Sequence, residues 1–142
     1  MKKVILWITM LCAGFMACGN GQTKEAEVQD DEDNVEILYF HGKQRCMTCK
    51  AIEQETKQVV ESCFADEVKK GLLAFRIIDI SKAENEPIAD KYEITWSSLV
   101  IVKHENGKEQ AENLTKFAFA NAHNKPDMFR SELTKKINGL LK

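Results

Sequence analysis

After residue 34, short apolar runs alternate with longer amphipathic stretches. Residues 35–40, 72–80 and 99–102 are nearly continuous in apolar side chains, which is typical of strands buried on both faces of a sheet. Between residues 51 and 68, apolar positions recur at three- and four-residue steps. This periodicity predicts an amphipathic helix of roughly twenty residues, closed by Gly71.

The later segments predict the remaining elements. Ser81 and Glu84 have the spacing of a capping box and open a short helix through residues 87–92. Asn106-Gly107 is a hairpin signal, so residues 108–113 should return antiparallel to 99–102. One helical turn is expected within residues 114–124, and a closing helix begins near Pro126.

The predicted order is therefore strand, helix, strand, helix, strand, strand, helix. With right-handed crossovers, the first three strands would lie parallel and the hairpin would add an antiparallel edge. The pattern predicts an α/β domain with a mixed, mostly parallel central sheet and helices on both faces.

Residues 1–17 have the pattern of a signal peptide. Lys2 and Lys3 precede an apolar run over residues 4–17, which is too short to span a membrane comfortably, and Cys18 follows. The run resembles a bacterial lipoprotein signal in which Cys18 becomes the lipidated first residue; the alternative is a plain secretory peptide cut nearby. Either reading places the domain outside the cytoplasm. The lipoprotein reading anchors it to a bacterial envelope, on the periplasmic side or the cell surface.

Residues 18–34 form an acidic segment between this anchor and the domain at residues 35–142. After Cys18 the segment has six acids against the single Lys24, so it buries too little apolar surface to order itself and is expected to be a flexible tether. The whole chain has 142 residues and a formal charge of −2. No basic field favours nucleic-acid binding.

Two cysteines at the start of the long helix are the main candidates for chemistry. Cys46 and Cys49 are three residues apart in the first turn, so they lie on one face, where a thiolate meets the positive end of the helix dipole. Cys46 would attack a partner disulfide and Cys49 would resolve the mixed disulfide. The residues expected to border the pair are His41, Arg45, Met47, Thr48, Lys50, Trp96 and Ser97.

Other interpretations of these cysteines carry less weight. A structural disulfide over two intervening residues would remove little chain entropy, and no second Cys or His pair follows at the spacing of a zinc site. Cys63 lies fourteen residues after Cys49 on the same predicted helix, about 21 Å away at 1.5 Å per residue. It is expected to be a buried core thiol and not a third ligand.

The order of elements, with the cysteine pair at the junction of the first strand and first helix, resembles the thioredoxin fold. Tyr39-Phe40-His41-Gly42 followed by residues 45–53 is similar to the ArsF-like thioredoxin-fold proteins of bacterial arsenic-resistance clusters. Compared with thioredoxins, Ser97 stands near the position of the cis-proline that faces the cysteines. Arg45 replaces the aromatic residue before the first cysteine, and Tyr39 or Leu38 occupies the region of the buried carboxylate.

Three hypotheses for function follow. The first is a thiol–disulfide oxidoreductase or electron carrier acting on a redox partner protein or thiol substrate, with no cofactor. The second is a binding module in which Cys46 and Cys49 hold a soft species such as arsenite or Cu(I), favoured by the loss of the shielding proline. The third is a structural lipoprotein subunit.

Overall fold

The computed structural model describes residues 33–142. The predicted signal peptide, the lipidation at Cys18 and most of the acidic tether lie outside the described residues. The strands are β1 (Asn34–His41), β2 (Leu73–Asp79), β3 (Ser98–Glu105) and β4 (Lys108–Asn113). The helices are α1 (Met47–Cys63), α2 (Ala65–Lys69), η1 (Ala83–Asn85), α3 (Glu86–Lys91), α4 (Thr115–Asn121) and α5 (Pro126–Leu140).

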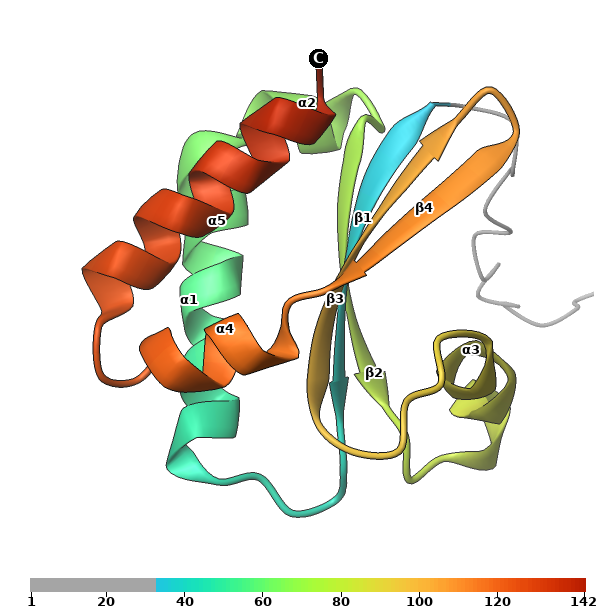
Figure 1. Cartoon of the computed structure of the whole chain (residues 1–142), viewed down its shortest axis with the longest axis vertical. Coiled ribbons are helices and arrows are strands. Elements are labelled where there is room, and N and C mark those ends of the chain that lie inside the picture. The colour runs from blue at the N-terminus through green and yellow to red at the C-terminus, as the bar shows by residue number, and fades with distance from the viewer. Residues whose placement is uncertain (1–32) are drawn as a thin grey trace, which may run out of the picture.

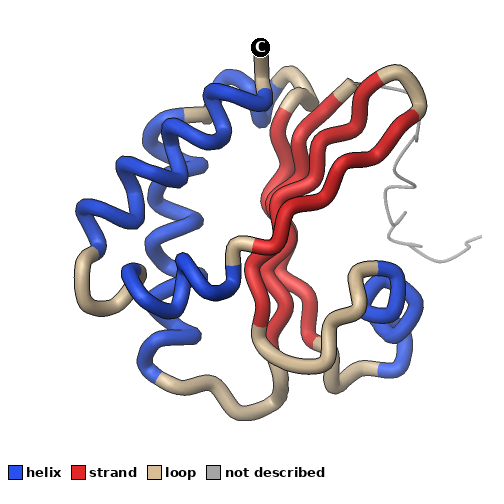
Figure 2. The backbone as a smooth tube through the Cα atoms, in the orientation of Figure 1, coloured by secondary structure: helices blue, strands red, loops and turns tan. Residues whose placement is uncertain are grey.

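The strands form one mixed sheet in the order β2-β1-β3-β4. Helices α1, α4 and α5 lie on one side of this sheet, and α3 lies on the other side near one end (Figures 1 and 2). The larger core cluster includes Ile37 and Tyr39 from β1, Ile52 from α1 and Phe129 from α5. A smaller cluster on the opposite face joins Leu38 and Phe40 to α3. Alternate residues of β1 thus enter different cores, because side chains alternate across a strand.

The mixed α/β fold with helices on both faces is confirmed, but the predicted direction of the third strand is wrong. β1 and β2 are parallel, whereas β3 runs antiparallel to β1, with Ser98 opposite Phe40. The connection between β2 and β3 explains the difference. This segment stays at the end of the sheet where β2 stops: Asn85 Nδ2 donates to the backbone carbonyl of Asp79 at 2.9 Å, and α3 lies beside that end of the sheet (Figure 1). The chain therefore re-enters the sheet at the end where it left.

The long helix is also interrupted earlier than the periodicity predicts. α1 ends at Cys63, and Phe64 leaves the helical conformation with φ −133° before α2 begins. This turn buries Phe64 at 2% exposure and leaves Cys63 exposed. The prediction that Cys63 is a buried core thiol is therefore wrong, because the turn places its neighbour in the core.

The predicted turns agree with the structure at two positions and differ at a third. Asn106 and Gly107 both have positive φ, as the tight turn between β3 and β4 requires, and Gly71 has φ +76° where α2 closes. The predicted capping box does not form. Ser81 instead donates its hydroxyl to Asp79 at 2.7 Å, and η1 begins at Ala83 without a side-chain cap.

Two C-terminal helices complete the layer over α1. The segment predicted to contain one helical turn is the seven-residue α4, and α5 starts at Pro126 as predicted. Phe117 of α4 stacks on Phe129 of α5 with ring centroids 5.5 Å apart. Both helices contact α1, so the start of α1 is held at a fixed place relative to the end of β1.

Candidate functional site: the Cys46–Cys49 pair

The cysteine pair lies where β1 ends and α1 begins. Cys46 is the N-cap residue of α1, with extended backbone, and its sulfur accepts a hydrogen bond from the backbone N–H of Cys49 at 3.2 Å. This contact satisfies one of the amide groups that a helix leaves unpaired at its start. The sequence thus uses a cysteine where serine, threonine or aspartate commonly caps a helix, and that choice aims the sulfur at the helix N-terminus.

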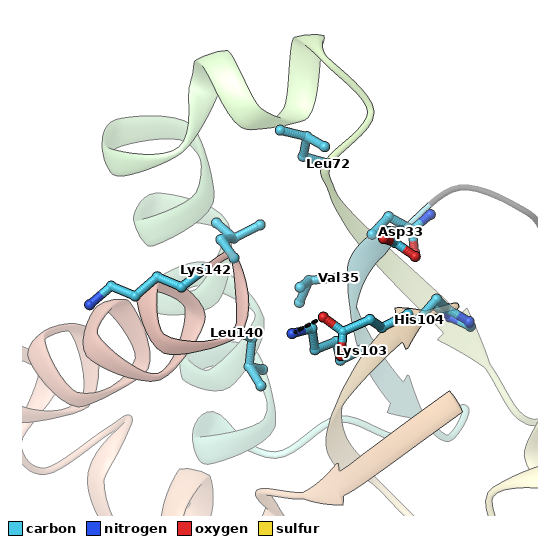
Figure 3. Close-up of a pocket in the computed structure, with 10 residues that line it drawn as sticks. Asp33, Val35, Leu72, Lys103, His104, Leu140 and Lys142 are labelled. Carbon is cyan, nitrogen blue, oxygen red and sulfur yellow. Dashed lines mark ion pairs between the residues drawn. The ribbon is translucent and has the colours of Figure 1, made fainter. Parts of the chain in front are cut away.

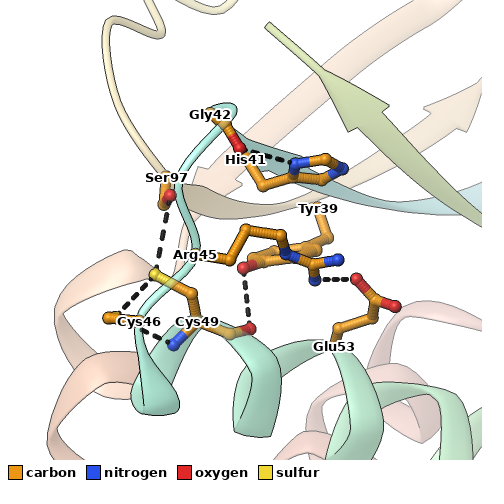
Figure 4. A network of polar contacts seen from close by, with 8 residues as sticks. All are labelled: Tyr39, His41, Gly42, Arg45, Cys46, Cys49, Glu53 and Ser97. Carbon is orange, nitrogen blue, oxygen red and sulfur yellow. Dashed lines mark hydrogen bonds and ion pairs between the residues drawn. The ribbon is translucent and has the colours of Figure 1, made fainter.

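The two thiols are close but differ in their access to solvent. The Sγ atoms of Cys46 and Cys49 are 2.8 Å apart, and both cysteines are in the free thiol form (Figure 4). Cys46 is exposed, whereas Cys49 retains 5% exposure. A partner sulfur can therefore reach Cys46 from solvent. Cys49 lies beneath Cys46, close enough to attack Cys46 Sγ.

Ser97 contacts the pair from the loop before β3. The Cys49 thiol donates to the Ser97 hydroxyl at 3.7 Å, and the described residues contain no cis peptide bond. The serine thus lies over the inner sulfur with a trans backbone, and it presents a hydroxyl where a proline would present its ring.

Burial raises the pKa of the Cys49 thiol, but hydrogen bonds to its thiolate, chiefly from Cys46 and Ser97, act in the opposite direction. They outweigh burial and leave the pKa of Cys49 below its ordinary value. The inner cysteine is therefore able to hold a negative charge despite being covered.

Tyr39 lies beneath Cys49 at the bottom of the site. Its side chain is fully buried, and its hydroxyl donates to the backbone carbonyl of Cys49 at 2.7 Å. Burial raises the pKa of Tyr39 to about 12, so this phenol stays protonated and remains a donor at neutral pH. Tyr39 joins β1 directly to the turn of α1 that carries the inner thiol.

Arg45 and Glu53 form an ion pair beside the thiols (Figure 4). Arg45 was predicted to border the pair, and the structure places it there with its charge matched by Glu53. The Cζ atom of Arg45 also lies 5.7 Å from the centroid of the Tyr39 ring, within cation–π distance.

The other predicted neighbours surround the pair in different ways. Met47 is 69% exposed, and Trp96 is 56% exposed while packing on Phe119 with centroids 5.2 Å apart. The ring of His41 donates from Nδ1 to the Gly42 carbonyl at 3.0 Å. Thr48 is half-buried in the first turn of α1, and Lys50 is exposed.

Tyr39 as a hydrogen-bond donor and Glu53 as the partner of Arg45 were not found from the sequence. Glu53 follows Cys49 by four residues, so helical spacing could have placed it on the same face. Its contact with Arg45 could not be found in this way, because Arg45 precedes the helix and reaches Glu53 only through the shape of the loop.

No metal centre of familiar composition is present among the described residues. Residues 33–142 contain no group of three or more His, Cys, Asp or Glu side chains placed to hold a metal ion. Cys63 lines a different pocket, between α1 and α5, with Arg130 and Ser131. A soft ligand at the candidate site would thus have two thiolates and the Ser97 hydroxyl as its protein donors.

Two further observations concern other parts of the domain. Leu72, His104 and Leu140 line a pocket that contains no cysteine, beside the start of β1 and therefore at the far end of that strand from Cys46 (Figure 3). Within the described part of the chain, no helix is both long and apolar enough to cross a membrane.

Comparisons with known proteins find similarity in structure alone. No protein-family model matches the chain, and no curated protein sequence matches it. A solved thioredoxin-like protein of uncharacterised function from Clostridium perfringens superposes with a TM-score of 0.50 at 15% identity, covering 79% of this chain and 76% of that one. A thioredoxin from Thermus thermophilus gives a TM-score of 0.46 at 15% identity over 75% of this chain and 72% of that one. Thioredoxin-2 of the malaria parasite gives a TM-score of 0.48 at 18% identity, covering 76% of this chain and 84% of that one.

The match to the Clostridium protein, at a TM-score of 0.50, identifies the fold. The chain therefore has a thioredoxin-like fold, with a CxxC pair at the N-terminus of α1.

Proposed function

We propose that this protein is an extracytoplasmic thiol–disulfide oxidoreductase or electron carrier that uses Cys46 and Cys49. The observation that carries the proposal is the arrangement of one exposed and one buried thiol 2.8 Å apart at a helix N-cap. A pair that only stabilised the fold would not need an exposed sulfur at this point. The thioredoxin-like fold supports the same conclusion as an analogy.

The two sulfurs can carry out exchange in two balanced steps. Cys49 first loses its proton to solvent, and the Cys46 proton then moves to the Cys49 thiolate. The Cys46 thiolate attacks one sulfur of a partner disulfide; the partner S–S bond breaks, and its second sulfur leaves as a thiolate that takes up a proton from solvent. Cys49 then loses its proton and attacks Cys46 Sγ. The mixed disulfide breaks, and the partner leaves with two thiols while this protein holds the Cys46–Cys49 disulfide.

Each cysteine suits one of these steps. Of the two cysteines in the pair, only Cys46 is open to a partner, so it is the attacking residue. The lowered pKa of Cys49 favours its thiolate, which can accept the Cys46 proton across 2.8 Å and which is needed again for the resolving step. Reversal of the same steps would oxidise a dithiol partner, so the reduction potential decides the direction of electron flow.

The proposed location follows from the N-terminal sequence. Residues 1–17 would direct export, Cys18 would carry the lipid, and the acidic segment would hold the domain away from the membrane surface. The partner would then be a redox protein or a thiol compound on the outer side of that membrane.

The exchange function is tested by trapping the partner. In the full chain with Cys49→Ala, Cys46 can still attack, but the mixed disulfide cannot be resolved from within. We expect a disulfide-linked complex in non-reducing gels that reductant releases and that Cys46→Ser abolishes. The outcome against the proposal is a Cys49→Ala chain that stays monomeric, together with a wild-type chain that does not catalyse insulin reduction or the refolding of scrambled ribonuclease. That outcome would favour the structural-subunit reading.

A second candidate function is the capture of a soft metalloid or metal, as the resemblance to ArsF-like proteins implies. The observation that favours it is Ser97, which contacts Cys49 through a trans backbone and leaves no proline ring over the sulfurs. Arsenite would form two As–S bonds with Cys46 and Cys49, each replacing an As–OH bond and releasing one water.

Ser97→Pro separates the two functions. We expect it to weaken arsenite binding by about tenfold or more, equivalent to about 1.4 kcal/mol, because the ring would cover the inner sulfur, while thiol exchange is retained or improved. Ser97→Ala is the matched control, since it removes the hydroxyl without adding a ring. Calorimetric titration of the reduced full chain measures the affinity, and binding that survives in the Cys46→Ser, Cys49→Ser double variant would exclude the cysteine pair as the ligand.

A further inference from the structure

The Arg45–Glu53 ion pair is the part of the site that the exchange steps leave without a role. Arg45 immediately precedes the exposed thiol, and Glu53 follows the inner thiol by one turn of α1. Their side chains retain only 25% and 26% exposure. Both charges are therefore partly shielded from solvent, where a charge acts on its neighbours more strongly than at an open surface.

Tyr39 connects this ion pair to the inner thiol. The Arg45 guanidinium lies over the Tyr39 ring, and the Tyr39 hydroxyl donates to the carbonyl of Cys49. Figure 4 shows Arg45, Glu53 and Tyr39 together on one side of the pair, with Ser97 approaching Cys49 from the other side. A change in either charged residue therefore acts on the same turn of helix that holds Cys49.

We propose that Arg45 and Glu53 are positioning residues whose opposite charges set the balance between the dithiol and disulfide forms of Cys46 and Cys49. This inference rests on the proposed exchange function. The reduced pair carries a thiolate charge that the disulfide lacks, so a nearby cation favours the dithiol and a nearby anion favours the disulfide. In the native protein the two charges offset each other.

The proposal differs from a purely mechanical role in the sign of its effects. If the ion pair only fastened the loop before α1 to the helix, losing either partner would break the same fastening and move the equilibrium in the same direction. If the charges set the balance, removing the cation and removing the anion must move it in opposite directions. Single and double substitutions therefore distinguish the two roles.

The experiment uses the full chain and the variants Arg45→Gln, Glu53→Gln and the double variant, equilibrated in glutathione redox buffers at neutral pH. Differential alkylation followed by peptide mass spectrometry reports the redox state of Cys46 and Cys49 without interference from the other cysteines. We expect Arg45→Gln to shift the equilibrium toward the disulfide by about threefold to tenfold, and Glu53→Gln to shift it toward the dithiol by a similar factor. Tenfold corresponds to about 30 mV.

The double variant should return to within about twofold of the native equilibrium, because both charges are gone, and Arg45→Lys should stay near the native value because it keeps the cation. Single variants that shift in the same direction, or that do not shift, overturn the proposal. Circular dichroism identifies any variant that fails to fold. If Arg45→Gln does not fold, the test rests on Arg45→Lys, which should stay near the native equilibrium, and on Glu53→Gln, which should shift it toward the dithiol. A native chain that forms no Cys46–Cys49 disulfide overturns the exchange function itself, which is a separate result.

Discussion

Replacing Cys46 with serine is expected to lower the rate of thiol–disulfide turnover by at least about a thousandfold. Serine keeps the size and the capping capacity of the side chain, so α1 should still begin at the same residue. A hydroxyl is not ionised at neutral pH and forms no disulfide, however, and Cys49 is too buried to meet a partner by itself. Insulin reduction with excess dithiothreitol measures the loss.

Cys63→Ser is the matched control for this prediction. Cys63 is also an exposed free thiol, but it lies at the other end of α1, next to α5. The change should leave turnover within about twofold of the native value, because surface substitutions away from a site seldom perturb it. If Cys46→Ser kept a tenth of the activity, or if Cys63→Ser removed it, the assignment of the attacking thiol would be wrong.

Truncating Phe129 is expected to have the largest effect on stability, with Phe129→Ala lowering the free energy of unfolding by about 3–5 kcal/mol. The ring is fully buried in the larger core and stacks on Phe117, with an angle of 14° between the ring planes. Its loss removes the burial of a large apolar side chain and leaves a cavity between α4 and α5. Urea denaturation followed by circular dichroism gives the change from the midpoint and slope.

The neighbouring residue supplies the control. Met128 is 50% exposed, so Met128→Ala should change the unfolding free energy by less than about 1 kcal/mol. A loss below about 1 kcal/mol for Phe129→Ala would contradict the placement of α5 against the sheet. Since α5 contacts α1, a destabilised Phe129→Ala chain should also lose exchange activity at lower temperature than the native chain.

Local features of the fold were predictable because their causes lie within a few residues. The hairpin at Asn106-Gly107 and the start of α5 at Pro126 each depend on backbone preferences that the residues themselves carry. The predicted capping box failed because Asp79 competes for the Ser81 hydroxyl. That competitor lies only two residues away, so even local rules can be overridden by a nearby acceptor.

The second sheet face shows why longer-range features were not predictable. Glu36 in β1 is 5% exposed, which is unusual for a carboxylate in an otherwise apolar strand. Its oxygens lie 3.2 Å from His104 Nε2 and 3.5 Å from Arg76 Nη1, on the two neighbouring strands. These partners are 68 and 40 residues away in the sequence, and only the pairing of β1 with β3 and β2 brings them together.

The sequence by itself determined the α/β class, most element positions and the pairing of Cys46 with Cys49, because hydrophobic period and helical spacing are local properties. The tertiary structure decided the direction of β3, the exposure of Cys63 and the surroundings of the thiols. Those surroundings consist of Tyr39 beneath Cys49, Ser97 beside it, and Arg45 matched by Glu53. The physical reason is that burial and charge pairing depend on which distant segments pack together, and no spacing along the chain specifies that packing.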